Sequence, residues 1–106
     1  MFARRISRDL KPNTAKNFTD HLENEVIPIL RKQKGFQDEM EFLAPDGAKV
    51  FTISLWDRKE SAETYARETF PKVEKIFAPF VEGVSRVETY EVPCSTCHKI
   101  GPTANF

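Results

Sequence analysis

Residues 48–70 read AKVFTISLWDRKESAETYARETF, and this stretch decides the fold. Val50–Trp56 is rich in β-branched and aromatic residues that alternate between two faces, which predicts a strand. Asp57 follows at once and Glu60 stands three residues later, a spacing typical of a helix start. The stretch therefore predicts a strand, a capping residue and a helix in succession. It places Trp56 at a strand end beside a helix start, where α+β proteins often hold pockets.

The composition predicts one soluble domain. The chain has 106 residues, enough for a core without metal or disulfide support. Its 16 basic and 16 acidic residues cancel, which argues against a nucleic-acid-binding protein. No apolar run approaches a membrane span, and the first ten residues lack the apolar region of a signal peptide. We expect a cytoplasmic protein with reduced cysteines and no membrane partner.

The residues before this stretch predict a strand, a helix and a second strand. In Phe2–Leu10, the alternation places Arg4 and Arg8 on the same face as three apolar side chains. Asn13 is predicted to cap a helix that runs to about Lys34, and Pro28 should bend or divide it. Phe36–Leu43 is the second strand. Its alternation puts Phe36, Asp38, Met40 and Phe42 on one face and Gln37, Glu39 and Glu41 on the other.

The residues after the stretch predict a further helix and a last strand. Pro71 should begin a helix with apolar residues at helical spacing, and Pro79 and Gly83 should end it. Val84–Val92 is predicted as the last strand. Residues 1–92 then form the domain, and residues 93–106 a C-terminal tail.

This order of elements predicts a ferredoxin-like split βαβ fold of the α+β class, with helices on one face of a four-stranded antiparallel sheet. The other face needs a cover, because large bare apolar patches mark interfaces. The residues predicted to need this cover are Val50, Thr52, Trp56, Phe36 and Phe42. A second copy of the chain, packed sheet against sheet, would supply the cover. We therefore expect a homodimer.

Three segments resemble the antibiotic biosynthesis monooxygenase-like family of dimeric α+β barrels: VIPILRKQKGFQDEMEFLAPDG, FTISLWDRKESAETY and VSRVETYEV. The resemblance implies a homodimer whose C-terminal segment reaches the partner. Family members include cofactor-free oxygenases of quinol-like aromatics and haem-degrading enzymes. Trp56 matches the family's strand-end tryptophan, and Tyr65 stands near a position where relatives often have histidine. Haem degradation is disfavoured, because no Asn lies in Phe2–Leu10 and no His lies between His21 and His98. No cofactor is expected.

Three side chains are candidates for catalysis: Trp56, Tyr65 and His21. Trp56 could stack on a flat ligand, while Tyr65 and His21 could act as acid or base. The alternatives are a packed indole ring and a solvated or core-edge histidine. Candidate pocket-lining residues are Phe18, Phe70, Phe77, Arg4 and Arg86.

Charged side chains also fall at positions predicted to face a buried layer: Arg4, Arg86, Asp38 and Glu88. A buried charge needs a partner, so these residues predict salt bridges across the dimer. The alternative is an arginine-lined site for an anion or polar ligand.

The tail contains Cys94-Ser95-Thr96-Cys97-His98, which matches the CxxCH pattern of covalent haem attachment. Its context, without an export signal or a surrounding helical domain, disfavours haem. Cys94, Cys97 and His98 are weak candidates for zinc ligands, and the two cysteines for a redox dithiol. We expect instead that the tail contacts the partner protomer.

Two functional hypotheses follow. The first is a cofactor-independent oxygenase acting on a small aromatic, quinol-like substrate between sheet and helices. The second is a dimeric small-molecule-binding or stress-related module without catalysis. A well-formed pocket with a convergent polar group favours the first hypothesis. A layer filled by phenylalanine side chains favours the second.

Overall fold

The structure is a computed structural model that describes residues 1–97. Four strands and a set of short helices follow one another in the predicted order. The strands are β1 (Phe2–Leu10), β2 (Phe36–Leu43), β3 (Lys49–Trp56) and β4 (Val81–Glu91). The helices are α1 (Ala15–His21), the π-helical η1 (Leu22–Val26), α2 (Ile27–Arg31), α3 (Lys59–Glu68), α4 (Phe70–Phe77) and the 3₁₀ turn η2 (Ala78–Phe80).

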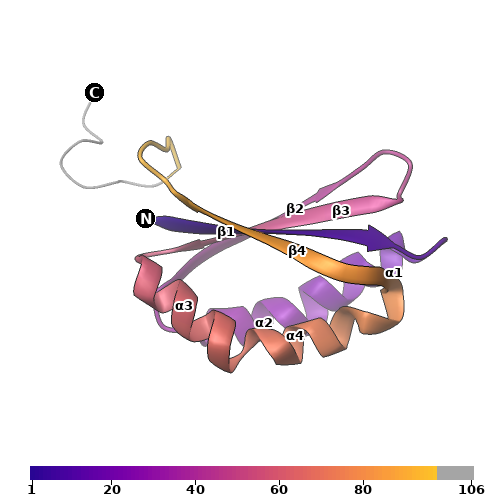
Figure 1. Cartoon of the computed structure of the whole chain (residues 1–106), viewed down its shortest axis with the longest axis horizontal. Helices are drawn as coiled ribbons and strands as arrows, with labels where there is room; N and C mark the ends of the chain where they lie inside the picture. The colour runs from indigo at the N-terminus through magenta and orange to yellow at the C-terminus, as the bar shows by residue number, and fades with distance from the viewer. Residues whose placement is uncertain (98–106) are drawn as a thin grey trace.

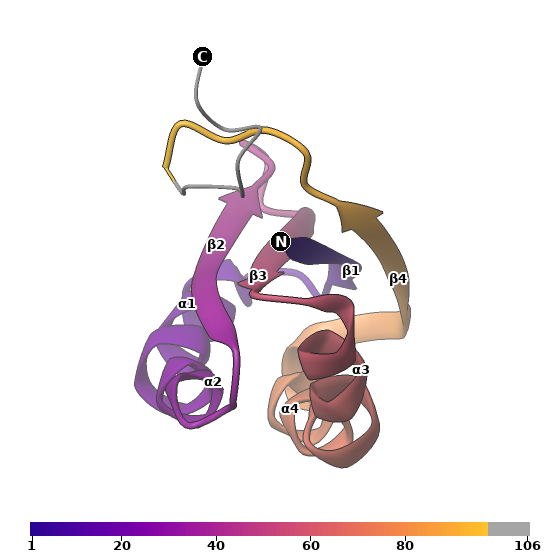
Figure 2. The ribbon, with the colours of Figure 1, turned by 90° about the vertical axis from the view of Figure 1, so that its left-hand side faces the viewer.

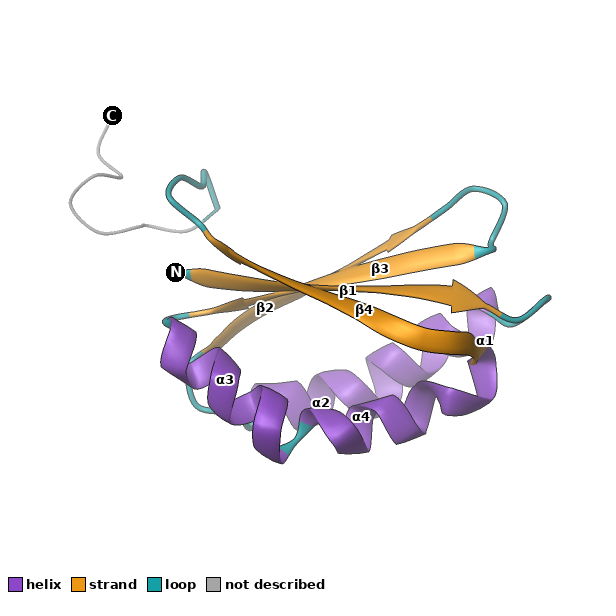
Figure 3. Ribbon diagram, in the orientation of Figure 1, coloured by secondary structure: helices purple, strands orange, loops and turns teal. Residues whose placement is uncertain are grey.

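The strands form one antiparallel sheet in the order β2-β3-β1-β4. Figures 1 and 3 show that the described helices all lie on one face of this sheet. Viewed from the end, they form two parallel rods, α1–α2 under β2 and α3–α4 under β4 (Figure 2). This confirms the predicted ferredoxin-like α+β architecture. No helix within residues 1–97 is long and apolar enough to cross a membrane.

The first helical segment differs from its prediction at the N-cap and agrees with it at Pro28. Asn13 adopts a left-handed φ of 62° and is not the cap; the N-cap position belongs to Thr14, whose hydroxyl donates to the Lys11 carbonyl. The segment is divided near Pro28, as predicted, into α1 and α2. Pro28 lies in the first turn of α2, and the π-helical turn η1 precedes it. Because proline lacks an N–H, a register change just before it avoids the missing α-helical hydrogen bond.

The second helical region begins one residue later than expected. Arg58 is the N-cap of α3, so Asp57 does not close a capping box with Glu60. Asp57 instead accepts a hydrogen bond from the Ser61 side chain, which lowers the pKa of its carboxyl group. Gly35 allows this arrangement. A Cβ there would lie 2.2 Å from an Asp57 oxygen and 2.4 Å from Ser61 Oγ, and the backbone has a φ of +83°.

The last strand begins at Val81, before Gly83, so Gly83 does not end a helix as predicted. Ser7 pairs with Arg86 and Asp9 with Glu82, which leaves Arg8 alone opposite residues 83–85. The two extra residues of β4 form a bulge, and Gly83 supports it with a φ of +69°. The strand is therefore longer than the sequence predicts and is deformed directly opposite Arg8.

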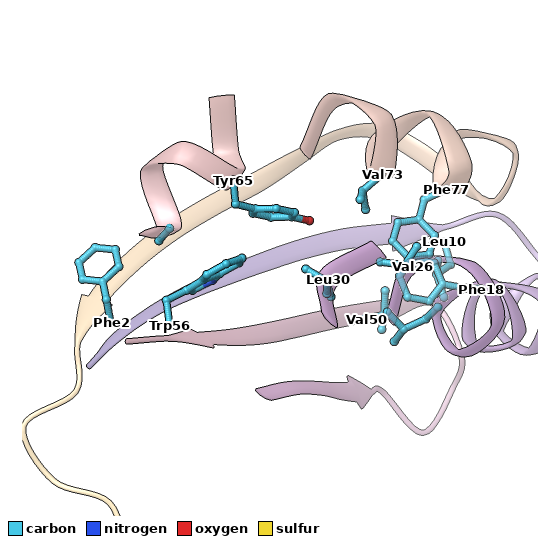
Figure 4. Close-up of a cluster of buried hydrophobic side chains, with 12 residues drawn as sticks. Phe2, Leu10, Phe18, Val26, Leu30, Val50, Trp56, Tyr65, Val73 and Phe77 are labelled. Carbon is cyan, nitrogen blue, oxygen red and sulfur yellow. The ribbon is translucent and has the colours of Figure 1, made fainter. Parts of the chain in front are cut away.

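The core lies between the sheet and the helices (Figure 4). Val50, Thr52 and Trp56 face the helices and are buried, so they are not part of the face that needs a cover. Phe36 packs edge-on against Trp56 on this same side. A β2 irregularity between Phe36 and Asp38 reverses the alternation, so Phe36 does not share a face with Met40 and Phe42 as predicted.

Candidate functional site

A set of charged and polar side chains lies inside the layer between sheet and helices. We call it the inner cluster: Arg4 and Arg8 from β1, Glu39 from β2, Tyr65 from α3 and Glu74 from α4. The alternation of β1 points both arginines toward the helices, alongside Ile6 and Leu10. Four separate elements thus converge on a polar site within an otherwise apolar core.

Arg8 is the most constrained member of the inner cluster. Its side chain is only 2% exposed, and its Nη2 donates to Glu74 Oε1 at 2.6 Å. The guanidinium also lies 4.8 Å from the centre of the Phe77 ring. Its Nε and Nη1 have no hydrogen-bond partner among residues 1–97. Buried donors without protein partners are unusual, and a bound water, an ion or a functional role can account for them.

Arg4 is buried and forms no ion pair with any residue of the described chain. Its guanidinium carbon lies 4.5 Å from the Phe70 ring centre and 5.5 Å from that of Tyr65. Burial lowers the pKa of Arg4, and the Tyr65 hydroxyl partly offsets that shift. Arg4 is therefore a cation held against aromatic faces rather than by a carboxylate.

Glu39 is the unusual acid of the cluster. Burial raises the pKa of its carboxyl group to about 8, although Arg8 and Arg4 act in the opposite direction. Its Oε1 has no partner within residues 1–97 and is sealed from solvent, while the rest of the side chain is only partly buried. A carboxyl group that titrates near neutral pH can act as a general base or acid.

Three members of the inner cluster, Arg8, Glu39 and Tyr65, line an enclosed cavity of about 10 Å³, room for about one water molecule. Tyr65 lies beside it, and burial followed by the Glu39 charge raises the pKa of its phenol. Figure 4 shows the Tyr65 hydroxyl directed toward the middle of the layer. The lining residues are Ile6, Arg8, Val26, Leu30, Glu39, Thr52, Ser54, Tyr65, Phe70, Val73 and Phe77.

Two surface grooves approach the cluster from outside. The Tyr65 groove, about 170 Å³, lies between the end of α2 and α3 and is lined by Gln33, Lys34, Arg58, Glu60, Ser61, Thr64 and Tyr65. The bulge groove, about 290 Å³, lies between α4 and the bulge of β4 and is lined by Arg8, Glu74, Phe77, Ala78, Val81, Gly83, Val84 and Ser85. Each groove shares at least one wall residue with the enclosed cavity.

Two of the three predicted catalytic residues lie together, and the third lies apart. Trp56 is fully buried, donates from Nε1 to Ser54 Oγ at 3.1 Å, and its ring lies 4.9 Å from that of Tyr65. His21 is 39% exposed at the end of α1, where its ring packs on Phe80. Trp56 and Tyr65 are therefore neighbours, whereas His21 lines neither the cavity nor the grooves of residues 1–97.

The predicted pocket residues divide between the two faces of the sheet. Phe70 and Phe77 line the cavity, and Phe18 stacks behind Phe77 with ring centres 4.1 Å apart. Arg86 lies on the open face of the sheet, 3.5 Å from Asp9, so it cannot share a pocket with Arg4 in one protomer. Glu88, also on the open face, pairs with Arg5 at 3.5 Å within the same chain.

The open face also carries aromatic and charged side chains. Phe42 stacks on Phe51 at 4.7 Å, and the Arg5 guanidinium lies 4.3 Å from the Phe51 ring centre. Met40, Phe42 and Tyr90 are 40–47% exposed.

In the tail, Cys94 and Cys97 are free and exposed, and no group of metal ligands occurs within residues 1–97. His98 and most of the predicted partner-contacting tail lie outside the described residues.

Sequence reasoning missed three members of the inner cluster as site residues. Arg8 carried a signal, because it repeats the position of Arg4 on the apolar face of the first strand. Glu39 carried none, since the β2 irregularity that places Phe36 with it on the helix-covered face is not visible in the sequence. Glu74 could not be paired with Arg8 before the tertiary fold was known, because 66 residues separate them.

Comparison with known proteins identifies the fold. No protein-family model and no curated protein matches the sequence. A monooxygenase from Streptomyces coelicolor, solved with the ligand nanaomycin D, has a TM-score of 0.72 at 15% identity over 84% of each chain. An antibiotic biosynthesis monooxygenase aligns with a TM-score of 0.67 at 15% identity, over 87% of this chain and 98% of the other. A Nitrosomonas europaea protein of unknown function aligns with a TM-score of 0.71 at 12% identity, over 86% and 87%. These structures confirm the resemblance at the level of the fold.

Proposed function

We propose that this protein oxygenates a small phenolic or quinol-like aromatic without a cofactor, in the layer between sheet and helices. One observation carries the proposal: Glu39, with its pKa raised to about 8, lines the same enclosed cavity as Arg8 and Tyr65. A base titrating near neutral pH beside a buried cation is what deprotonation of a phenol requires. The fold shared with monooxygenases supports this reading.

In the proposed reaction, Glu39 accepts the proton of a substrate hydroxyl, and the buried guanidiniums of Arg8 and Arg4 stabilise the phenolate. The phenolate supplies all four electrons that reduce O₂. The O–O bond breaks, one oxygen atom replaces a ring hydrogen to give a quinone, and the other leaves as water. A phenol plus O₂ thus gives a quinone plus water, with no external reductant. The Trp56 ring packs against the Tyr65 ring and would fix its position.

Substrate entry requires a side chain to move, because about 10 Å³ cannot hold an aromatic ring. Tyr65 is the best placed to do so, since it lines both the enclosed cavity and the Tyr65 groove. Rotation of its ring would join the groove of about 170 Å³ to the cavity. We infer that Tyr65 is the entrance to the site as well as one of its walls.

The small volume of the cavity favours a second candidate, a non-catalytic binding module. Phe18, Phe77 and Val73 fill one end of the layer, and Trp56 and Tyr65 fill the other (Figure 4). In this alternative the inner cluster is structural, or binds a small molecule without turnover. Both candidates share the proposed homodimer, in which the open face with Phe42, Phe51 and Tyr90 packs on a second copy.

Oxygen uptake with 1-naphthol at pH 8 tests the oxygenase proposal. We expect enzyme-dependent uptake and one atom of ¹⁸O from ¹⁸O₂ in the quinone product. Glu39→Gln should lower the rate by about 100-fold, as expected for loss of a general base. Glu41→Gln is the matched control, because Glu41 lies two residues away on the same strand face and hydrogen-bonds Thr19 instead. Equal rates for both variants, or no turnover of a phenol series, would leave only the binding module.

Sedimentation and light scattering test the dimer. We expect a mass of twice 12.2 kDa at micromolar concentration. Phe42→Asp should give monomers, because it places a charge in the centre of the proposed contact. Truncation after Val92 should weaken the dimer while the domain stays folded. A stable monomer in the unmodified protein would refute the proposed assembly.

A further inference from the structure

The bulge groove is a second site, distinct from the enclosed cavity and separated from it by Arg8 and Phe77. It exists because β4 departs from the sheet opposite Arg8, where one residue of β1 faces residues 83–85. Val84, at the top of this bulge, is 84% exposed and does not fill the space. The bulge thus lies beside a surface groove that has the buried Arg8 as one of its walls.

The polar end of the bulge groove has the chemistry of a carboxylate site. Arg8 Nη2 and Ser85 Oγ both donate to the carboxylate of Glu74, each at 2.6 Å. The Glu74 side chain is 33% exposed, whereas Arg8 is 2% exposed. Glu74 therefore reaches in from the rim of the groove, and its carboxylate occupies the position between a cation and a hydroxyl. An external carboxylate could take the same two hydrogen bonds.

The rest of the groove is apolar. Phe77, Ala78, Val81 and Val84 line it beyond Arg8 and Glu74. A ligand with a charged head and an apolar body matches this division, with the head at Arg8 and the body along α4 and the bulge.

The charge balance of the inner cluster also favours an added anion. Arg4 and Arg8 are two buried cations, and Glu74 is the only carboxylate in residues 1–97 that pairs with either. Glu39 retains its proton up to about pH 8, since burial raises its pKa. At neutral pH the cluster thus lacks one negative charge, and Arg8 still has unpartnered donors.

We propose that the bulge groove binds a small carboxylic acid with an apolar body, anchored by Arg8 and Ser85, and that Glu74 occupies the anchor when no ligand is bound. This inference does not depend on oxygenase activity. In this proposal the Glu74 carboxylate competes with the ligand for Arg8 and Ser85. Removing that carboxylate should therefore free both groups for the ligand.

Benzoate is the probe and benzamide its neutral counterpart, with binding followed by calorimetry and by amide shifts in ¹H–¹⁵N spectra. We expect benzoate to shift the amides of Gly83, Val84 and Ser85, and benzamide to bind at least tenfold more weakly. Glu74→Ala should tighten benzoate binding at least tenfold. Arg8→Met, which keeps an apolar stem of similar length, should weaken it at least tenfold.

Two further variants keep the test decisive. Arg86→Met removes an arginine from the other face of the sheet, directly after the bulge, and should change benzoate affinity less than twofold. Ala78→Trp fills the groove from an exposed position on its rim and should abolish binding without touching the core. Equal benzoate affinity in Arg8→Met and Arg86→Met, or no gain in Glu74→Ala, would overturn the proposal. Benzoate binding by an unmodified protein that turns over no phenol would refute only the oxygenase.

Discussion

On the helix-covered face of the sheet, Arg8 is 2% exposed, whereas on the open face Phe42 is 43% exposed. The charged side chain is therefore inside the protein and the aromatic one is at its surface. For these two side chains, burial depends on which face of the sheet they lie on and not on their polarity. This arrangement is unfavourable on both faces. A buried cation needs an anionic or hydrogen-bonding partner, and exposed aromatic rings favour a contact that removes them from water. The comparison is consistent with the two proposals made above, a polar site on the covered face and a homodimer contact on the open face.

The largest difference between the two faces should appear when one large ring is removed from each. Trp56→Ala removes a fully buried indole and should lower the free energy of unfolding by about 3–5 kcal/mol. Phe42→Ala removes a half-exposed ring and should cost about 1 kcal/mol in the monomer. Urea unfolding by circular dichroism measures both.

Protein concentration sharpens this test. If the open face forms the dimer, the cost of Phe42→Ala should grow with protein concentration, because association stabilises the folded state. The cost of Trp56→Ala should depend on it much less. A cost below about 1 kcal/mol for Trp56→Ala would mean that the indole contributes little packing.

The alternation of the strands was enough to predict which residues share a face in β1 and β3. Arg4, Ile6 and Arg8 do lie together, and so do Thr52 and Trp56. The sequence could not say which face the helices cover, because the more apolar face of the third strand, with Phe51, Ile53 and Leu55, is the open one. Val50 and Trp56 were therefore candidates for the open face and lie instead beneath the helices.

The site was harder to predict because two irregularities build it. The shift in β2 turns Glu39 inward with Phe36, and the bulge in β4 opens the groove at Arg8. Strand bulges change the side-chain period by one or more residues, so period-two reasoning places the affected residues on the wrong face. Sequence spacing also cannot reveal the contact between Arg8 and Glu74, which depends on α4 packing beneath β1.

A second comparison uses one arginine from each face. Arg8→Met leaves Glu74 without its buried partner and should cost about 3 kcal/mol. Arg5→Met breaks an exposed pair with Glu88, in which the side chains are 39% and 51% exposed, and should cost less than about 1 kcal/mol. Thermal unfolding at matched pH measures the two. Equal costs would show that Arg8 is solvated in solution and that the inner cluster is open to water.

The smallest expected difference between the two faces is in pH dependence, to which Glu39 contributes. Its pKa is about 8 in the folded chain, against an ordinary value of about 4.3 when unfolded. Below pH 4 both states hold the proton, so Glu39 adds no pH dependence. Between pH 4 and 8 only the folded state holds it, so the free energy of unfolding falls as pH rises. Above pH 8 both states are ionised and the effect is constant.

Glu39→Gln isolates this contribution, because glutamine stays neutral throughout. Relative to that variant, the unmodified protein should lose about 2 kcal/mol of stability between pH 5 and 8. The figure is below the full linkage value because part of the Glu39 side chain meets solvent. Glu88→Gln, on the open face, should leave the pH profile nearly parallel to that of the unmodified protein, since the contacts of its carboxylate with Arg5 and the Tyr90 hydroxyl are exposed. Parallel profiles for all three proteins would mean that Glu39 is ionised at neutral pH. The covered face would then hold no base poised near neutral pH, and the difference in chemistry between the two faces would disappear.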